Sequence, residues 1–333
     1  MSILKVFIVT LVLFFSLINI TVTFADAPEL GTWATGAPAP TKRTEVAVAT
    51  VEGKIYVVGG FNKPSLKNAL DYAISRAVEV YDPETNTWTT ATPLPEGRHH
   101  AGIAVLNGKL YVIGGFAQSL LSVWKAVPTV YQYDPVTAVW RELAQMPTAR
   151  GALGVTVYRD RLYAIGGYDG ERNTAAVEVF DPQSDTWSSA ASIPSPRDHL
   201  AIVTAGSRIY AIGGRSDLDY HQNTGIVEEY NPKTDQWQSR AKLPTARSGM
   251  AAGVIDGRIF VLGGESGQGT FATNEAYIPD ADKWLAMAPM PTPRHGLGAA
   301  VVGGRLYVIS GGPTPGGSFS QVNEIFTPPV FSN

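Results

Sequence analysis

Hydrophobic positions along the chain fall in short runs, and one kind of run recurs at a regular interval. Six such segments end in a Gly-Gly doublet, at residues 54–60, 109–115, 161–167, 208–214, 258–264 and 305–312. The last of them carries one extra residue, Ser310, before its doublet. A turn dipeptide such as Asn107-Gly108 precedes each segment, and another apolar run such as 101–106 lies before that dipeptide. Two apolar runs joined by two turn residues are typical of a β-hairpin, so the pattern predicts six hairpins.

A third apolar segment follows each hairpin and ends in or just before Pro, at residues 78–83, 130–135, 177–182, 227–232, 274–279 and 323–328. In the first five units a Trp lies five residues after that Pro, at Trp88, Trp140, Trp187, Trp237 and Trp284. The sixth unit has no such residue, whereas Trp33 stands at the other end of the chain. We therefore expect the segment around Trp33 to complete the sixth unit, which closes the ring and removes the exposed sheet edge.

Four short strands per unit and six units predict an all-β fold, a six-bladed β-propeller. A period near 50 residues with Gly-Gly, Tyr and Trp at fixed offsets resembles the kelch repeat. The resemblance extends over residues 26–333 and implies one propeller domain. It is specific for the fold and much less so for function, because this fold serves many functions.

Residues 1–25 have the pattern of a secretory signal peptide. Lys5 precedes an apolar run at 6–20, and Thr23-Phe24-Ala25 places small residues where a signal peptidase cleaves. The alternative is an uncleaved membrane anchor. We expect cleavage after Ala25, with residues 26–333 secreted or periplasmic and not inserted in a membrane.

Composition excludes several classes of function. The chain has 26 basic and 29 acidic residues and a formal net charge of −3, so nucleic-acid binding is not expected. It contains no cysteine, which excludes disulfides, zinc–thiolate sites and cysteine nucleophiles. The kelch resemblance also raises the copper enzyme galactose oxidase, whose radical cofactor needs a Tyr cross-linked to a Cys. The lack of cysteine excludes that chemistry as well.

One arginine opens every unit. These residues are Arg43, Arg98, Arg150, Arg197, Arg247 and Arg294. In the kelch layout they lie at the start of the strand that lines the central channel. They either satisfy neighbouring carbonyls and acids, or ring the channel mouth and hold an acidic ligand. A Glu of the third segment recurs in five units, and such regular use predicts a structural hydrogen-bond acceptor.

The two residues after each arginine differ between units, and they include four of the five histidines: His99, His100, His199 and His295. With Glu45 and Asp198 they are candidates to converge on the channel mouth. Such a group suits zinc, copper or proton transfer. Against a metal, the channel is wide, and residues on alternate blades are expected to lie too far apart to share an ion. We therefore expect these side chains to line a ligand site with no metal and no cofactor.

The loop after each Gly-Gly also varies, and it is longest in the first two units. The second of these loops holds Trp124, the one Trp outside the repeat pattern. Long loops on a rigid scaffold commonly carry binding residues, and an exposed aromatic suits a sugar or a protein. The alternative is that these loops only pack against each other.

These observations favour an exported, non-catalytic binding module whose ligand is a protein, a glycan or an acidic molecule. The alternative is a carbohydrate-active enzyme similar to the periplasmic sialic-acid mutarotase (N-acetylneuraminate epimerase), which uses the same mouth. A third possibility is a scaffold whose partner binds the flanks of the blades.

Overall fold

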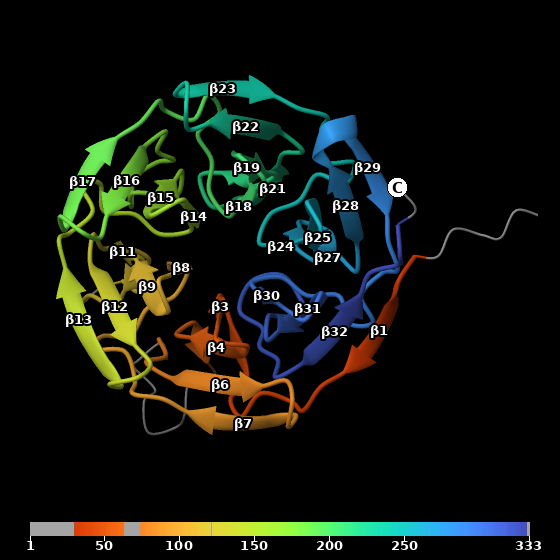
Figure 1. Ribbon diagram of the computed structural model, residues 1–333, viewed down its shortest axis with the longest axis horizontal. Coiled ribbons are helices and arrows are strands. Elements are labelled where there is room, and N and C mark those ends of the chain that lie inside the picture. Colours follow the sequence, from red (N-terminus) through yellow and green to blue (C-terminus); the bar gives the residue numbers. More distant parts are fainter. Residues whose placement is uncertain (1–29, 63–73, 121, 332–333) are drawn as a thin grey trace, which may run out of the picture.

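The computed structural model describes residues 30–62, 74–120 and 122–331. Six four-stranded antiparallel sheets stand around a central axis as blades (Figure 1). The innermost strand of each blade contacts the innermost strands of both neighbouring blades. The predicted six-bladed β-propeller is therefore confirmed. The signal peptide predicted for residues 1–25 lies outside the described residues, and within them no helix has the length and apolar character to cross a membrane.

The strands of each blade are numbered from the channel outward. Blade one contains β3 (Ala47–Val51), β4 (Lys54–Val58), β6 (Val78–Asp82) and β7 (Thr87–Thr90). Blade two contains β8 (Gly102–Leu106), β9 (Lys109–Ile113), β12 (Val130–Asp134) and β13 (Val139–Leu143). Blade three contains β14 (Gly154–Tyr158), β15 (Arg161–Ile165), β16 (Val177–Asp181) and β17 (Thr186–Ser189).

Blade four contains β18 (Ala201–Ala205), β19 (Arg208–Ile212), β22 (Val227–Asn231) and β23 (Gln236–Ser239). Blade five contains β24 (Ala251–Ile255), β25 (Arg258–Leu262), β28 (Asn274–Ile278) and β29 (Lys283–Ala286), with the 3-10 turn η2 (Pro279–Ala281) between the last two. Blade six contains β30 (Gly298–Val302), β31 (Arg305–Ile309), β32 (Asn323–Thr327) and β1 (Thr32–Thr35).

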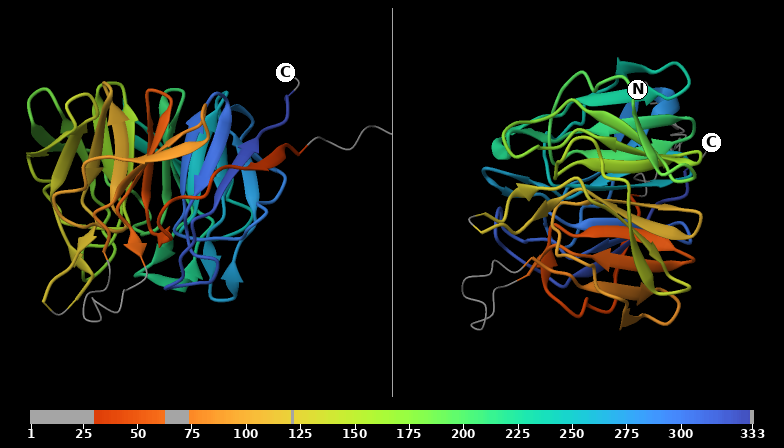
Figure 2. Two further views of the ribbon diagram at one scale, coloured as in Figure 1. Left: turned by 90° about the horizontal axis from the view of Figure 1, so that it is seen from below. Right: turned by 90° about the vertical axis from the view of Figure 1, so that its left-hand side faces the viewer.

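Short additional strands gather at one end of the propeller, as Figure 2 shows, and this end is called the mouth face. They are β2 (Arg43–Thr44), β5 (Phe61–Asn62), β10 (Phe116–Ala117), β11 (Lys125–Ala126), β20 (Arg215–Ser216), β21 (Asp219–Asn223), β26 (Glu265–Ser266) and β27 (Gly269–Thr270). The chain runs from the mouth face along the first strand of a blade and returns along the second. The hairpin turns between these strands therefore lie on the opposite face.

Strand β1 closes the ring. It pairs antiparallel with β32, so that Trp33 lies opposite Phe326 and Thr35 lies opposite Glu324. In Figure 1 the first strand of the chain lies beside the last one. The prediction from the missing sixth Trp is confirmed, and β32 has a partner on both sides.

The hydrophobic core is divided into six clusters, each shared by two neighbouring blades. Between blades one and two, for example, Tyr56 and Val58 pack with Leu110 and Val112. Each repeat Trp donates its indole N–H to a carbonyl in the segment that joins the two preceding blades, at 2.8–2.9 Å. These bonds are Trp33–Ala288, Trp88–Ala37, Trp140–Thr92, Trp187–Ala144, Trp237–Ala191 and Trp284–Ala241. The prediction that Tyr and Trp side chains pack between blades is confirmed, and their large buried area stabilises the blade contacts.

The Gly-Gly turns require glycine for both conformation and space. Gly59 has a φ of +64°, and a Cβ there would lie 2.4 Å from the carbonyl oxygen of Arg98 in the next blade. The sixth turn differs from the prediction, because Ser310 is not an extra residue. Ser310 (φ +60°) and Gly311 (φ +94°) occupy the places of the two glycines, and Arg294 donates to the Ser310 carbonyl as Arg150 does to that of Gly166.

Candidate functional site

Each blade holds the residue after its recurring arginine in the same way. That residue forms a β-bridge with the residue that follows the turn at the end of the second strand. The six pairs are Thr44–Phe61, His99–Phe116, Gly151–Tyr168, Asp198–Arg215, Ser248–Glu265 and His295–Gly312. Both members of each pair differ from blade to blade. The bridges therefore bring the variable positions of all six repeats to the mouth face.

The six arginines do not line this mouth. Each is at most 1% exposed. In five blades the guanidinium pairs with the Glu of the third strand at 2.5–2.6 Å, as Arg43–Glu79, Arg150–Glu178, Arg197–Glu228, Arg247–Glu275 and Arg294–Glu324. Arg98 pairs instead with Glu96 at 2.7 Å, because Tyr131 replaces the Glu in blade two.

The remaining guanidinium hydrogens bind backbone carbonyls. Arg150, for example, donates to the carbonyls of Thr148, Ala164 and Gly166 at 2.9–3.0 Å. A buried guanidinium with its donors occupied has none left for an incoming carboxylate. The hypothesis of an arginine ring that holds an acidic ligand is therefore wrong. The prediction that the recurring Glu is a structural acceptor is confirmed.

The second residue after each arginine builds a closed ring around the axis. These six residues are Glu45, His100, Ala152, His199, Gly249 and Gly296, and all have φ between +51° and +62°. The N–H of each donates to the carbonyl of its counterpart in the preceding blade, at 2.7–3.2 Å. We call this set the axial ring. It fixes the backbone at the narrowest part of the mouth.

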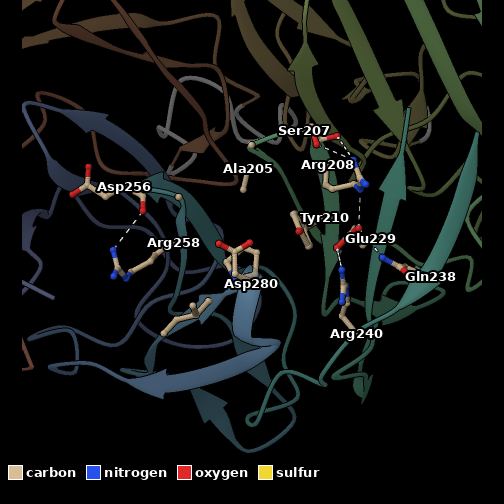
Figure 3. A pocket seen from close by; sticks show the side chains of 14 residues that line it. Ala205, Ser207, Arg208, Tyr210, Glu229, Gln238, Arg240, Asp256, Arg258 and Asp280 are labelled. Atoms are coloured by element: carbon tan, nitrogen blue, oxygen red, sulfur yellow. Dashed lines mark hydrogen bonds and ion pairs between the residues drawn. The ribbon is translucent and has the colours of Figure 1, made fainter. Parts of the chain in front are cut away.

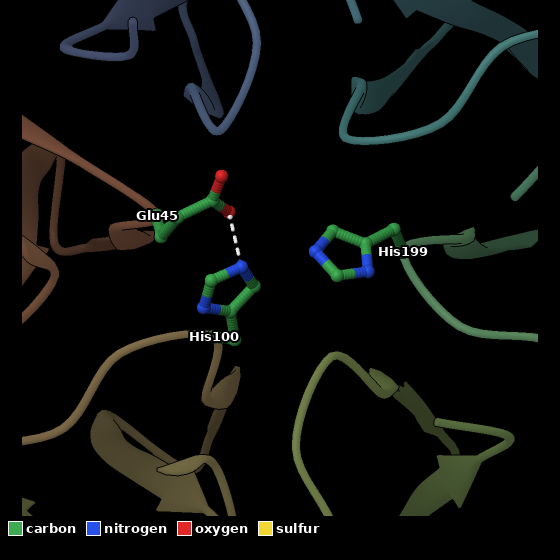
Figure 4. Close-up of side chains that lie close together, drawn as sticks. All are labelled: Glu45, His100 and His199. Carbon is green, nitrogen blue, oxygen red and sulfur yellow. Dashed lines mark ion pairs between the residues drawn. The ribbon is translucent and has the colours of Figure 1, made fainter. Parts of the chain in front are cut away.

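Three side chains of the axial ring project toward one another (Figure 4). Glu45, His100 and His199 come from blades one, two and four, and each has one potential ligand atom within 4.8 Å of the other two. The expectation that alternate blades hold such residues too far apart is wrong. The left-handed backbone turns these side chains inward, so that they meet across the axis.

Hydrogen bonds fix the protonation of His99 and His100. The Nε2 of His99 lies 2.8 Å from the Val123 carbonyl, which only accepts, so Nε2 carries the proton. The bare Nδ1 of His99 then accepts from Nδ1–H of His100 at 2.6 Å. Burial lowers the pKa of His99 to about 3 and that of His100 well below its usual value. Both rings are neutral at pH 7, and Nε2 of His100 has a free electron pair.

That electron pair faces Glu45. Its carboxyl oxygen lies 3.0 Å from Nε2 of His100. Burial, together with the neighbouring Glu265 carboxylate, raises the pKa of Glu45 to about 8, while Arg215 opposes this shift. Glu45 therefore carries a proton at pH 7 and donates it to His100. Gly296 makes room for this carboxyl, because a Cβ there would lie 2.4 Å from its oxygen.

His199 is held by an acid and a base. Its Nδ1–H donates to Asp198 at 2.5 Å, and its Nε2 accepts from Arg215 at 2.8 Å. Burial raises the pKa of Asp198, but the hydrogen bond from His199 and the charge of Arg215 outweigh it, so the net shift is downward. Arg215 also pairs with Glu265 at 2.6 Å. Asp198 and Glu265 thus flank one buried cation.

A cavity of about 320 Å³ opens above this cluster on the mouth face. Glu45, His100, Arg215, Glu265 and His295 contribute to its lining. Its apolar wall consists of Phe61, Val123, Trp124, Leu218, Tyr220 and Phe319, which come from the loops of blades one, two, four and six. The cavity is called the mouth cavity below.

Most of the non-arginine site predictions meet here. Glu45, His100, His295 and Trp124 line the mouth cavity, and His199 lies directly beneath it in the axial ring. His99 stacks on Phe61 with ring centroids 3.8 Å apart and does not line the cavity. Trp124 is 38% exposed at the rim and contacts the rings of Phe61 and His100.

Two charged residues of the site were missed. Arg215 and Glu265 directly follow the Gly-Gly doublets of blades four and five, where the first three blades have Phe61, Phe116 and Tyr168. A charged residue at a position otherwise aromatic was a signal in the sequence that could have identified both.

A larger groove of about 750 Å³ lies on the opposite face between blades four and five (Figure 3). Its central carboxylate, Glu229, is 1% exposed and accepts hydrogen bonds from Arg208, Arg240 and Gln238 at 2.7–3.0 Å. None of the predicted site residues lines this groove. Since Glu229 and these two arginines satisfy each other, we assign the functional site to the mouth cavity.

Comparison with known families agrees with the repeat pattern. A family model described as the KLHDC2/KLHL20/DRC7 Kelch-repeats domain matches residues 21–167 and 93–264, and the Kelch motif matches residues 246–291. The chain belongs to the kelch-repeat family. This kelch-repeat propeller therefore shares its repeat with proteins of widely differing organisms.

Curated relatives match parts of the kelch-repeat propeller. Kelch-like protein terF of Aspergillus terreus is 36% identical over 127 residues, which cover 38% of this chain and 27% of the relative. Human Kelch-like protein 28 is 39% identical over 103 residues, which cover 30% and 18%. Beta-scruin of Limulus polyphemus is 30% identical over 152 residues, which cover 46% and 16%. The matched region is thus less than a third of each relative.

A solved structure titled "Structure of YjhT" has a similar fold. It superposes with a TM-score of 0.74 and 18% sequence identity, over 88% of this chain and 97% of the other. At this identity the similarity supports the propeller fold alone.

Proposed function

We propose that this kelch-repeat propeller is a protein-binding module and that its partner docks on the mouth face. Kelch-repeat proteins generally bind proteins. The observation that carries the proposal is the mouth cavity, whose apolar wall is assembled from loops of four different blades. Loops carried by a rigid scaffold are common binding surfaces, and aromatic residues are frequent anchors of protein interfaces.

The charges beneath the cavity select what enters it. Arg215 contributes one positive charge, Asp198 and Glu265 contribute two negative charges, and Glu45 and His100 are neutral at pH 7. The net charge is therefore about −1, which disfavours an acidic group. A neutral side chain of the partner, with an apolar body and a hydrogen-bonding end, fits the aromatic wall and the polar floor.

Peptide display tests this proposal. Peptides are selected on the wild-type protein and then measured against Trp124→Ala. The matched control is Val136→Ser, an exposed apolar residue between β12 and β13 on the opposite face. We expect Trp124→Ala to weaken binding by about 30-fold, as for an interface anchor, and Val136→Ser to leave it unchanged. Selected peptides that bind both variants equally would contradict docking at the mouth.

The protonated Glu45 favours a second candidate, a carbohydrate-active enzyme. A neutral carboxyl beside a neutral imidazole is an arrangement suited to general acid–base catalysis, and the cavity has the size of a single sugar ring. This candidate predicts turnover of a sugar that is lost in Glu45→Gln. The negative floor disfavours a sugar acid such as sialic acid, so neutral sugars are screened first. Selected peptides whose binding is insensitive to all sugars support the binding module instead.

Export is a further proposal. If residues 1–25 act as a signal peptide, protein recovered from a secreting host begins at Asp26, which mass spectrometry of the intact chain detects. A chain that retains residues 1–25 would contradict this proposal.

A further inference from the structure

The axial ring contains a set of side chains that has the composition of a metal site. Two imidazoles and one carboxylate converge on one point, with their candidate ligand atoms all within 4.8 Å of one another. Zinc bound at 2.0–2.2 Å in a tetrahedral site separates its ligand atoms by about 3.4 Å. Glu45 and His100 are already 3.0 Å apart. The remaining approach of His199 is at most about 1.4 Å, which a small side-chain rotation supplies.

The hydrogen bonds outside this set orient both imidazoles for coordination. Nδ1–H of His199 donates to the buried carboxylate of Asp198 at 2.5 Å. Nδ1–H of His100 donates to His99, which is itself anchored on the Val123 carbonyl. A metal-binding histidine almost always donates its other ring N–H to a carboxylate, carbonyl or similar acceptor. Here this support leaves both Nε2 atoms directed toward the axis.

The backbone at these positions is a second, independent observation. Glu45, His100 and His199 have φ of +55°, +52° and +51°, a region that L residues other than glycine rarely occupy. Blades five and six have Gly249 and Gly296 at the equivalent positions. Non-glycine residues held in this region are concentrated at functional sites. Their side chains are thus placed at the axis against the preference of the backbone.

The charges around the site balance a divalent cation. Glu45, Asp198 and Glu265 provide three negative charges when all three are ionised. Arg215 and a divalent ion together provide three positive charges. Arg215 now donates to Nε2 of His199 at 2.8 Å, and this is the one hydrogen bond that a metal displaces. Arg215 keeps its pairs with Glu265 and Asp198 at 2.6 and 3.3 Å.

We propose that Glu45, His100 and His199 form a binding site for a divalent first-row transition-metal ion at the axis of the propeller. Two imidazole nitrogens and one carboxylate oxygen favour zinc and its neighbours over calcium and magnesium, which prefer oxygen ligands. Glu45 and His100 also line the mouth cavity, so a remaining coordination position faces that cavity. The site is independent of the partner proposed above.

Titration of the metal-free protein with Co²⁺ tests the proposal. We expect one equivalent to bind and to develop the visible absorption of four- or five-coordinate cobalt, and Zn²⁺ to remove that absorption. Glu45→Gln and His100→Gln should abolish it. Asp198→Asn, which alters only the support of His199, should weaken the affinity by about 10–100-fold. Unfolding midpoints of the metal-free variants are measured alongside, so that a loss of fold is recognised.

His221→Ala is the control for adventitious binding. The His221 side chain is 67% exposed and lies outside the axial ring. This variant should bind cobalt as the wild-type protein does. The proposal is overturned if the wild-type protein develops no cobalt absorption. It is equally overturned if folded Glu45→Gln and His100→Gln bind like wild type, or if His221→Ala abolishes binding.

Discussion

The same arginine position has two different partners in this propeller, and the difference leads to a quantitative prediction. Arg150 is fully buried and pairs with Glu178, whose side chain is 6% exposed. Arg98 is almost as buried, but its partner Glu96 is 54% exposed. We compare Glu178→Gln with Glu96→Gln. Each change removes one carboxylate charge and keeps the shape of the side chain.

The expected magnitudes follow from burial. Loss of the Glu178 charge leaves the Arg150 guanidinium in a low-dielectric site without a counter-charge. Burial already lowers the pKa of Arg150, and Glu178 is the charge that opposes this effect. Removal of one partner of a buried pair costs about 3–5 kcal/mol. Glu96 is solvated, and an ion pair with an exposed partner contributes about 0–1 kcal/mol.

Equilibrium unfolding in urea, followed by tryptophan fluorescence, measures both free energies. We expect Glu178→Gln to lower the free energy of unfolding by at least about 2 kcal/mol more than Glu96→Gln does. Losses that are equal, or both below about 1 kcal/mol, would refute the assignment of the arginines to structural charge pairs.

Three further predictions concern the axial ring and the closure of the propeller. Because the folded state raises the pKa of Glu45 to about 8, it keeps a proton that the unfolded chain loses near pH 4.5; stability should therefore fall between these pH values by as much as about 5 kcal/mol relative to Glu45→Gln, measured by urea unfolding with a chelator present. A result in which the two proteins have parallel pH profiles would contradict this. Gly296→Ala should lower stability by about 2–4 kcal/mol, because its Cβ meets the Glu45 carboxyl at 2.4 Å, whereas Gly249→Ala, with no neighbour closer than 3.6 Å, should cost only the left-handed backbone, about 1–2 kcal/mol; equal losses would argue against this placement of Glu45. Deletion of residues 30–35 removes β1 and Trp33 and exposes the edge of β32, so the shortened chain should aggregate in light-scattering measurements, and a stable monomer would show that the ring does not need this closure.

The sequence was sufficient for most of the fold, because the information is local and repeated six times. Alternating apolar runs, turn dipeptides and Gly-Gly doublets recur in each unit. Even the long-range pairing of β1 with β32 could be predicted, since Trp33 supplied the member that the sixth repeat lacked. The one local error, at Ser310, arose because a serine can adopt the left-handed conformation that the other five repeats give to glycine.

The site was only partly predictable. Variable residues next to an invariant arginine marked Glu45, His100, His199 and His295, and a Trp outside the repeat marked Trp124. The same reasoning placed the arginines at the mouth, because sequence separation does not show that a Glu about 30 residues later lies 2.5–2.6 Å from the guanidinium.

The amino-acid sequence by itself determined the number of blades, the strand that closes the ring and the positions at which the blades differ. Only the tertiary structure decided which of those side chains meet. The ring had to close before the distance across the axis was defined. The left-handed φ of Glu45, His100 and His199, set by hydrogen bonds between consecutive blades, then turned their side chains toward one another. Burial, which depends on all six blades together, determined that the arginines are structural and that Glu45 keeps its proton.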